Sequence, residues 1–137
     1  IPLDLRGTAL EAVLPCKLPE GRTEWAQPPA PVPLEFTDEG RKVFDGAKTP
    51  IPAGKAVWWN GEGTLAYLPL SVSTAGRPLA TIQGHPDQVA FAVCNYGKGV
   101  VFQANLDDTW RWRAQDPSPH ASFWKTVVRL VARRDAK

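Results

Sequence analysis

The chain has 137 residues, of which 43% are hydrophobic and 22% are charged, a composition typical of one globular domain rather than a disordered segment. Its 16 basic residues nearly balance 14 acidic ones, which gives no reason to expect a nucleic-acid partner. No apolar run approaches the roughly 20 residues that a membrane-spanning helix needs, so we expect no direct membrane insertion by residues 1–137.

The first part of the chain is rich in proline. Thr8–Leu14 predicts a short helix, with Thr8 as its N-cap and Glu11 three residues on, as in a capping box. Residues 15–35 form a proline-rich crossing or insertion, because proline fixes φ and removes a hydrogen-bond donor from runs such as Gln27–Pro33. We interpret it as a surface crossing within the domain, with an interdomain linker as the alternative.

Short elements follow the proline-rich part. Leu34–Phe36 predicts a strand, and Thr37–Phe44 predicts a helical turn that is capped by Thr37 and weakened by Gly40. Two further segments predict short extended pieces, each followed by a turn-like composition. The segments are Ala56–Trp59 before Asn60–Gly63, and Leu79–Gln83 before Gly84–Pro86.

The clearest predicted element is a β-hairpin. Gln88–Asn95 and Val100–Asn105 are β-rich runs, and the connection Tyr96–Gly99 holds two glycines that can supply positive φ. The first run is apolar on both faces, so we expect a strand that is buried on both sides in a sheet covered by helices. One face holds Val89, Phe91 and Val93, and the other holds Ala90, Ala92 and Cys94.

An amphipathic helix is predicted to begin at Ser118-Pro119, with serine as the cap, and to pack across the sheet. Its apolar residues recur at helical spacing, with basic residues on the other side. The apolar stripe comprises Phe123, Trp124, Val127, Val128, Leu130 and Val131, and the basic side comprises Lys125, Arg129 and Arg133.

Between hairpin and helix, acids, indoles and guanidinium groups occur in one short run. Asp107 and Asp108 are candidate metal ligands with His120, but we favour the interpretation that they accept hydrogen bonds from backbone amides or pair with arginines of the run. We expect no metal and no cofactor.

Two tryptophans of this run alternate with two arginines. In an extended chain Trp110 and Trp112 face one way and Arg111 and Arg113 the other. We favour packing of both indoles between the sheet and the last helix; the alternative is a binding surface for a sugar, a peptide or a partner domain. The tryptophans expected to be most exposed are Trp25, Trp58 and Trp59.

Neither cysteine has zinc-ligand spacing, and Cys16 and Cys94 are predicted to be small buried apolar residues. The sequence does not decide whether the two cysteines form a disulfide.

Several segments together resemble the C-terminal part of a class I glutamine amidotransferase-like family. They are Leu10–Pro15 (LEAVLP), Thr37–Arg41 (TDEGR), Tyr96–Arg113 (YGKGVVFQANLDDTWRWR) and His120–Ala132 (HASFWKTVVRLVA). Members of this family occur within large bacterial proteins, often with von Willebrand factor A-like domains and membrane helices.

The resemblance implies an α/β fold, a flavodoxin-like three-layer sandwich. This chain would hold its C-terminal part, with the β-hairpin and the amphipathic helix. The first βαβ units would lie upstream of Ile1, which would leave a sheet edge exposed.

The resemblance also directs attention to catalytic groups. Active amidotransferases use a cysteine on a strand-to-helix elbow, and neither cysteine here has that context. His85 and Asp87, separated by one proline, resemble the histidine–carboxylate pair of active enzymes. A turn that closes the preceding strand explains them as well, and we favour that interpretation.

From this we hypothesise a non-catalytic structural or interaction module of a larger bacterial envelope-associated protein, with other domains or envelope proteins as partners. One alternative is a cysteine- or serine-dependent hydrolase or amidase whose nucleophile lies upstream. Another is a carbohydrate-binding module with exposed tryptophans. The sequence fixes no localisation; the resemblance implies an extracytoplasmic or membrane-associated position through the parent protein.

Overall fold

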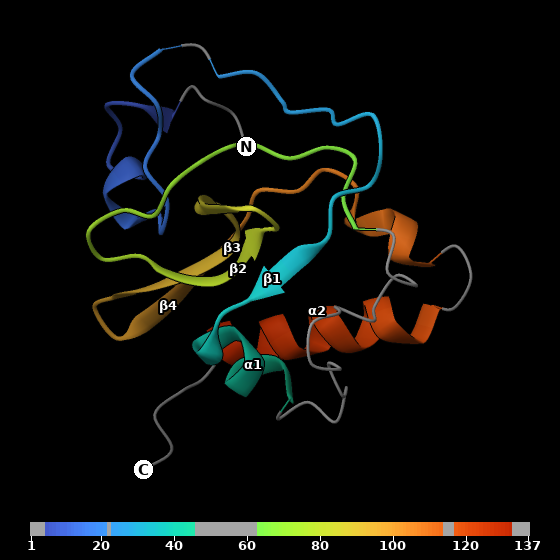
Figure 1. The fold of residues 1–137 in the computed structure, drawn as a ribbon. Helices are drawn as coiled ribbons and strands as arrows, with labels where there is room; N and C mark the ends of the chain where they lie inside the picture. Colours follow the sequence, from blue (N-terminus) through green and yellow to red (C-terminus); the bar gives the residue numbers. More distant parts are fainter. Residues whose placement is uncertain (1–4, 22, 46–62, 114–116, 133–137) are drawn as a thin grey trace.

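The computed structural model describes residues 5–21, 23–45, 63–113 and 117–132 (Figure 1). These residues form an α/β fold of one sheet and two α-helices. In chain order the elements are the 3-10 helix η2 (Glu11–Val13), β1 (Leu34–Phe36), α1 (Asp38–Asp45), β2 (Arg77–Ile82), β3 (His85–Tyr96), β4 (Gly99–Ala104), the 3-10 helix η4 (Thr109–Arg113) and α2 (Pro117–Val131). The predicted strand Ala56–Trp59 and residues 60–62 of the turn after it lie outside the described residues.

The sheet has the order β1-β2-β3-β4, and every neighbouring pair of strands is antiparallel. The predicted hairpin is confirmed: Tyr96 pairs with Gly99 across the two-residue turn Gly97-Lys98. Gly97 adopts a φ of 56°, a conformation that other residues rarely take.

A second hairpin joins β2 to β3 through the turn Gln83-Gly84, where Gly84 has a φ of 78°. The turn was predicted at Gly84–Pro86, but His85 already belongs to β3. The turn is therefore shorter, because one glycine with positive φ is enough to close it.

β3 is buried on both faces, as predicted: all six residues from 89 to 94 are at most 3% exposed. The alternation of its side chains is interrupted, however. The pairs Ala80–Phe91 and Thr81–Val89 leave Ala90 as an extra residue on β3, which is a β-bulge. Val89 consequently packs with Ala92 instead of sharing the cluster of Phe91.

Helices α1 and α2 lie together on one face of the sheet, where the main hydrophobic core forms (Figure 1). Phe123 of α2 stacks on Phe44 of α1 at 5.2 Å between ring centroids and lies 5.0 Å from Phe91 of β3. Other members of this core include Leu34, Phe36, Leu79, Ile82, Val93, Trp112 and Val127.

The other face of the sheet is covered by irregular segments rather than by helices, which corrects part of the expected layering. Cys16, Leu68, Leu70, Val89 and Ala92 form a smaller cluster there. Single β-bridges hold these segments together, joining Cys16 to Val72, Ala26 to Tyr67, Val32 to Thr64 and Tyr67 to Leu106. Three of these bridges come from within residues 15–35, so that this stretch is hydrogen-bonded to the segment 63–72.

Two predicted helix starts are wrong. Thr8 caps no helix: its hydroxyl donates to the carbonyl of Leu5, and only the 3-10 turn Glu11–Val13 forms. The C-terminal helix begins at Pro117, so Ser118 lies inside its first turn.

The buried stripe of α2 is also narrower than expected. Val128 and Val131 are 59% and 37% exposed, whereas Phe123 and Val127 are buried. Of the expected basic side, Lys125 and Arg129 are exposed, and Arg133 lies outside the described residues. None of the described helices is long and apolar enough to cross a membrane.

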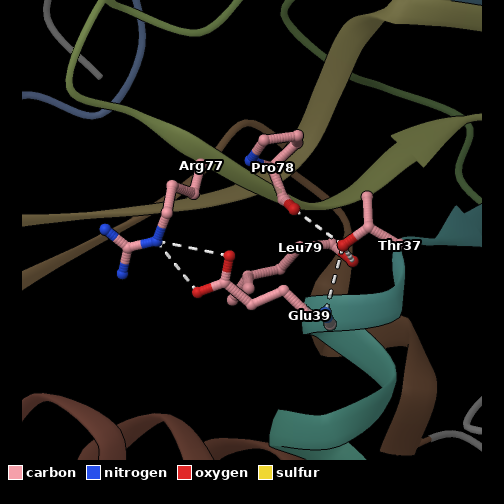
Figure 2. A network of polar contacts seen from close by, with 6 residues as sticks. Thr37, Glu39, Arg77, Pro78 and Leu79 are labelled. Atoms are coloured by element: carbon pink, nitrogen blue, oxygen red, sulfur yellow. Dashed lines mark hydrogen bonds and ion pairs between the residues drawn. The ribbon is translucent and has the colours of Figure 1, made fainter.

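The N-terminus of α1 is fixed to β2 by the predicted cap (Figure 2). The Thr37 hydroxyl accepts a hydrogen bond from the Gly40 amide at 3.1 Å and donates to the Pro78 carbonyl at 2.7 Å. The Thr37 amide donates to the Leu79 carbonyl at 3.0 Å. One threonine therefore both caps the helix and attaches it to the sheet.

This close approach explains the glycine in α1. A Cβ on residue 40 would overlap the carbonyl oxygen of Leu79. Gly40, which weakens the helix by propensity, is required because it lets the helix backbone approach β2.

We predict that Gly40→Ala lowers the free energy of unfolding by roughly 1–3 kcal/mol, the usual cost of overpacking, although alanine favours helix by about 1 kcal/mol. Denaturant unfolding followed by circular dichroism measures it. The matched control is Glu39→Ala, which removes a half-exposed ion pair to Arg77 and should cost about 1 kcal/mol or less. A stabilised Gly40→Ala variant would contradict the packing argument.

Candidate functional site

The candidate site centres on Asp108, which follows β4 and is 5% exposed. Its carboxylate accepts hydrogen bonds from the Thr64 hydroxyl at 2.7 Å and from the Leu65 amide at 2.8 Å. Arg111 lies 3.3 Å away. These contacts join the irregular segment at residues 64–65 to η4, as in the favoured interpretation of this acid.

The other two candidate metal ligands, Asp107 and His120, do not come together with Asp108. Asp107 is exposed, and its amide donates to the Ala66 carbonyl. His120 uses Nε2 to accept a hydrogen bond from the Trp124 indole at 3.1 Å. Among the described residues no group of three or more His, Cys, Asp or Glu side chains could hold a metal ion.

The His120 side chain therefore takes part in the packing around α2. Its ring lies edge-on to Trp112 and Trp124, with centroids 6.5 and 6.4 Å away. Burial, and secondarily the positive charge of Arg113, lower the pKa of His120 below its ordinary value, so the neutral imidazole that accepts from Trp124 is favoured.

The run of tryptophans and arginines is a 3-10 helix, so the alternation described for an extended chain does not apply. With three residues per turn, positions two apart point in different directions. Trp112 is 3% exposed, whereas Trp110 is 60% exposed. Arg113 is exposed and Arg111 half-buried.

Of the two indoles expected to pack between the sheet and the last helix, Trp112 does so. Its indole lies edge-on to Phe123 of α2 at 5.1 Å and to Phe91 of β3 at 6.2 Å. A side chain that contacts both elements stabilises their packing beyond the area it buries. Trp110 contributes no such contact and faces solvent, and Trp25 is also exposed, at 37%; Trp58 and Trp59 lie outside the described residues.

The possible catalytic pair is exposed at the start of β3. His85 and Asp87 form no side-chain hydrogen bond with the described residues, and both face solvent. Cys94 lies nine residues further along the same strand, which is about 30 Å at the usual rise per residue. That separation is far beyond the hydrogen-bond distance that a histidine–cysteine pair needs.

Sequence reasoning missed a buried polar network next to Cys16. The Gln103 side chain accepts a hydrogen bond from the Cys16 amide at 3.2 Å and donates one to the side-chain oxygen Oδ1 of Asn105 at 2.9 Å. Asn105 donates to the Val89 carbonyl at 2.8 Å and to the Cys16 sulfur at 3.4 Å. The sequence signal for this network was the pair of amide side chains, Gln103 and Asn105, two positions apart in an otherwise apolar run.

Both thiols are buried and free. Burial raises the pKa of Cys16 to about 11, against the opposing hydrogen bond from Asn105. Burial also raises the pKa of Cys94, whose thiol donates to the Val13 carbonyl at 3.3 Å. A nucleophilic cysteine needs a lowered pKa and access to substrate, so neither thiol has the required environment.

Comparison with models of known protein families, with curated proteins and with solved structures finds no significant match in any of the three.

We predict that Trp112→Ala lowers the free energy of unfolding by about 3–5 kcal/mol, as for other buried aromatic residues. Trp110→Ala, the matched exposed position, should stay within about 0.5 kcal/mol of the parent. Urea titrations of both variants measure the difference. Equal losses for the two variants would contradict the assignment of Trp112 as the residue that fixes α2.

Proposed function

We propose that this chain is a non-catalytic structural or interaction module with a class I glutamine amidotransferase-like fold, within a larger bacterial envelope-associated protein. The proposal rests mainly on the hydrogen bonds and the ion pair of the buried Asp108 carboxylate. This carboxylate is occupied by Thr64, Leu65 and Arg111, so it serves the fold instead of standing open to a substrate.

The histidine and the cysteines support the same proposal. His85 is exposed and distant from Cys94, and the raised pKa of Cys16 keeps that thiol protonated at neutral pH. Among the described residues no nucleophile and base lie together, which is the arrangement that amide hydrolysis by such an enzyme needs.

The fold assignment is part of the proposal. The described sheet is antiparallel throughout, with helices on one face. In a flavodoxin-like protein, parallel strands with helices on both faces make up the centre of the sheet. We propose that those strands belong to the parent protein and that this chain forms the C-terminal edge of its sheet.

Glutaminase and esterase assays on the parent protein test the absence of catalysis. We expect background rates that do not change in a His85→Ala variant, because no described nucleophile faces this imidazole. A rate above background that disappears on replacing His85 would support the hydrolase alternative and contradict the proposal.

Exposed indoles favour carbohydrate binding as a second candidate. Trp110 is 60% exposed beside Arg113, whose Nε donates to the Trp110 carbonyl at 3.4 Å, and tryptophan is enriched at binding interfaces because its ring is apolar and its N–H polar. If the surface binds glycans, intrinsic fluorescence should change on addition of soluble cell-wall or storage glycans, and Trp110→Ala should abolish the change. Unchanged fluorescence with every glycan would count against this candidate.

A further inference from the structure

One edge of the sheet is open. β4 pairs with β3 along its whole length, and the amide of Asn105 donates to the Ala90 carbonyl. Because backbone groups alternate along a strand, Val100, Phe102 and Ala104 direct their N–H and C=O groups away from β3. Within the described part of the chain, no other strand pairs with this side of β4.

The open edge lacks the usual protection against pairing. Its sequence from Gly99 to Ala104 contains neither proline nor a charged residue, and its register with β3 runs without a bulge. Natural edge strands commonly carry one of these features, because unpaired backbone groups otherwise attract another strand. The regular geometry of β4 therefore suits addition of a strand.

Apolar surface continues from this edge onto α2. The ring of Phe102 lies 6.4 Å from the indole of Trp124, which is half-buried. Trp124 in turn lines a shallow surface hollow with Ala121 and Val128, and Val128 is 59% exposed. The contact between Phe102 and Trp124 therefore places this apolar stripe next to the open edge of β4.

We propose that β4 pairs in antiparallel orientation with β4 of a second copy of this chain, about a two-fold axis at Phe102. An isologous contact requires a surface that is complementary to itself. Pairing Phe102 with its counterpart sets Val100 opposite Ala104 of the second copy, so small and medium apolar residues meet on both sides of the axis.

The charges at the two ends of the edge favour this register. Continued past the ends of β4, the same pairing brings Lys98, in the turn before the strand, toward Asp107 of the second copy, three residues after the strand. Lys98 and Asp107 are both exposed and carry opposite charges, and the symmetry forms the pair twice. A parallel pairing, by contrast, would bring like charges together.

Because Phe102 contacts Trp124, the apolar residues Ala121, Trp124 and Val128 of α2 also lie close to the proposed two-fold axis. Ala121 and Val128 lie on either side of Trp124 along α2, so the stripe too is roughly symmetric about its centre. Lys125 and Arg129 border the hollow, and long side chains of this kind keep their charges in water while their stems cover apolar surface.

Sedimentation equilibrium of the 137-residue chain and of charge variants tests the proposal. We expect a monomer–dimer equilibrium that is weakened about tenfold by Lys98→Glu and by Asp107→Lys, because each replaces two attractions with two repulsions. The double variant restores both pairs with reversed polarity and should return to the parent's dissociation constant. A chain that stays monomeric up to about 1 mM, or a double variant weaker than either single one, would overturn the proposal.

Val100→Pro tests the backbone contact directly. It removes an N–H that faces outward, a position where edge strands tolerate proline, so we expect a folded monomer. Val100→Ala is the matched control, because it shortens the side chain but keeps the N–H, and it should still dimerise. A dimer that survives Val100→Pro would place the contact elsewhere and overturn the proposal. The outcome is independent of the proposed function, since these variants leave His85 and Asp108 in place.

Discussion

The rest of the structure depends on one constraint: β3 carries apolar side chains on both faces, so both faces of the sheet must be covered. The described helices cover one face, with Phe123 and Val127 of α2 among the buried residues. The other face is covered by extended segments near Cys16 and Leu68. A hydrophobic requirement thus brings irregular backbone into contact with the sheet.

Covering a sheet with irregular backbone creates a second requirement. Amides and carbonyls that lie in neither helix nor sheet must find partners once they are buried. Gln103 binds the Cys16 amide, Asn105 binds the Val89 carbonyl, and Asp108 binds the Leu65 amide. These three polar side chains therefore stabilise the irregular layer. Their role explains why Asp108, a candidate metal or binding residue in the sequence, is buried in the fold.

Elements whose signals are local could be predicted from the sequence. The two glycines around Lys98 predicted the hairpin, and the oxygen of Thr37 predicted the start of α1, because each acts within a few residues. The packing expected for both indoles of the run was right for Trp112 and wrong for Trp110. Periodicity alone could not show that a 3-10 turn buries Trp112 and exposes Trp110, since both indoles suit either environment.

The second layer could not be predicted because its partners lie far apart in the sequence. Asp108 meets Thr64 across 44 positions, and Cys16 meets Gln103 across 87. Such contacts follow from the path of the whole chain, which local propensity does not determine. The candidate site could not be predicted for the same reason. Its residue types suggested metal or ligand binding, whereas the partners of Asp108, distant in sequence, show that this residue has a structural role.

The buried network also bears on the open edge. Gln103 and Asn105 fix β4 and the residue after it from the side that faces β3 and the irregular layer, and Phe102 fixes it from the helix face. A strand held along both faces loses little conformational freedom when another strand joins it, which lowers the entropic cost of association. The interactions that occupy the polar residues of this segment would therefore also prepare its edge to bind a second copy.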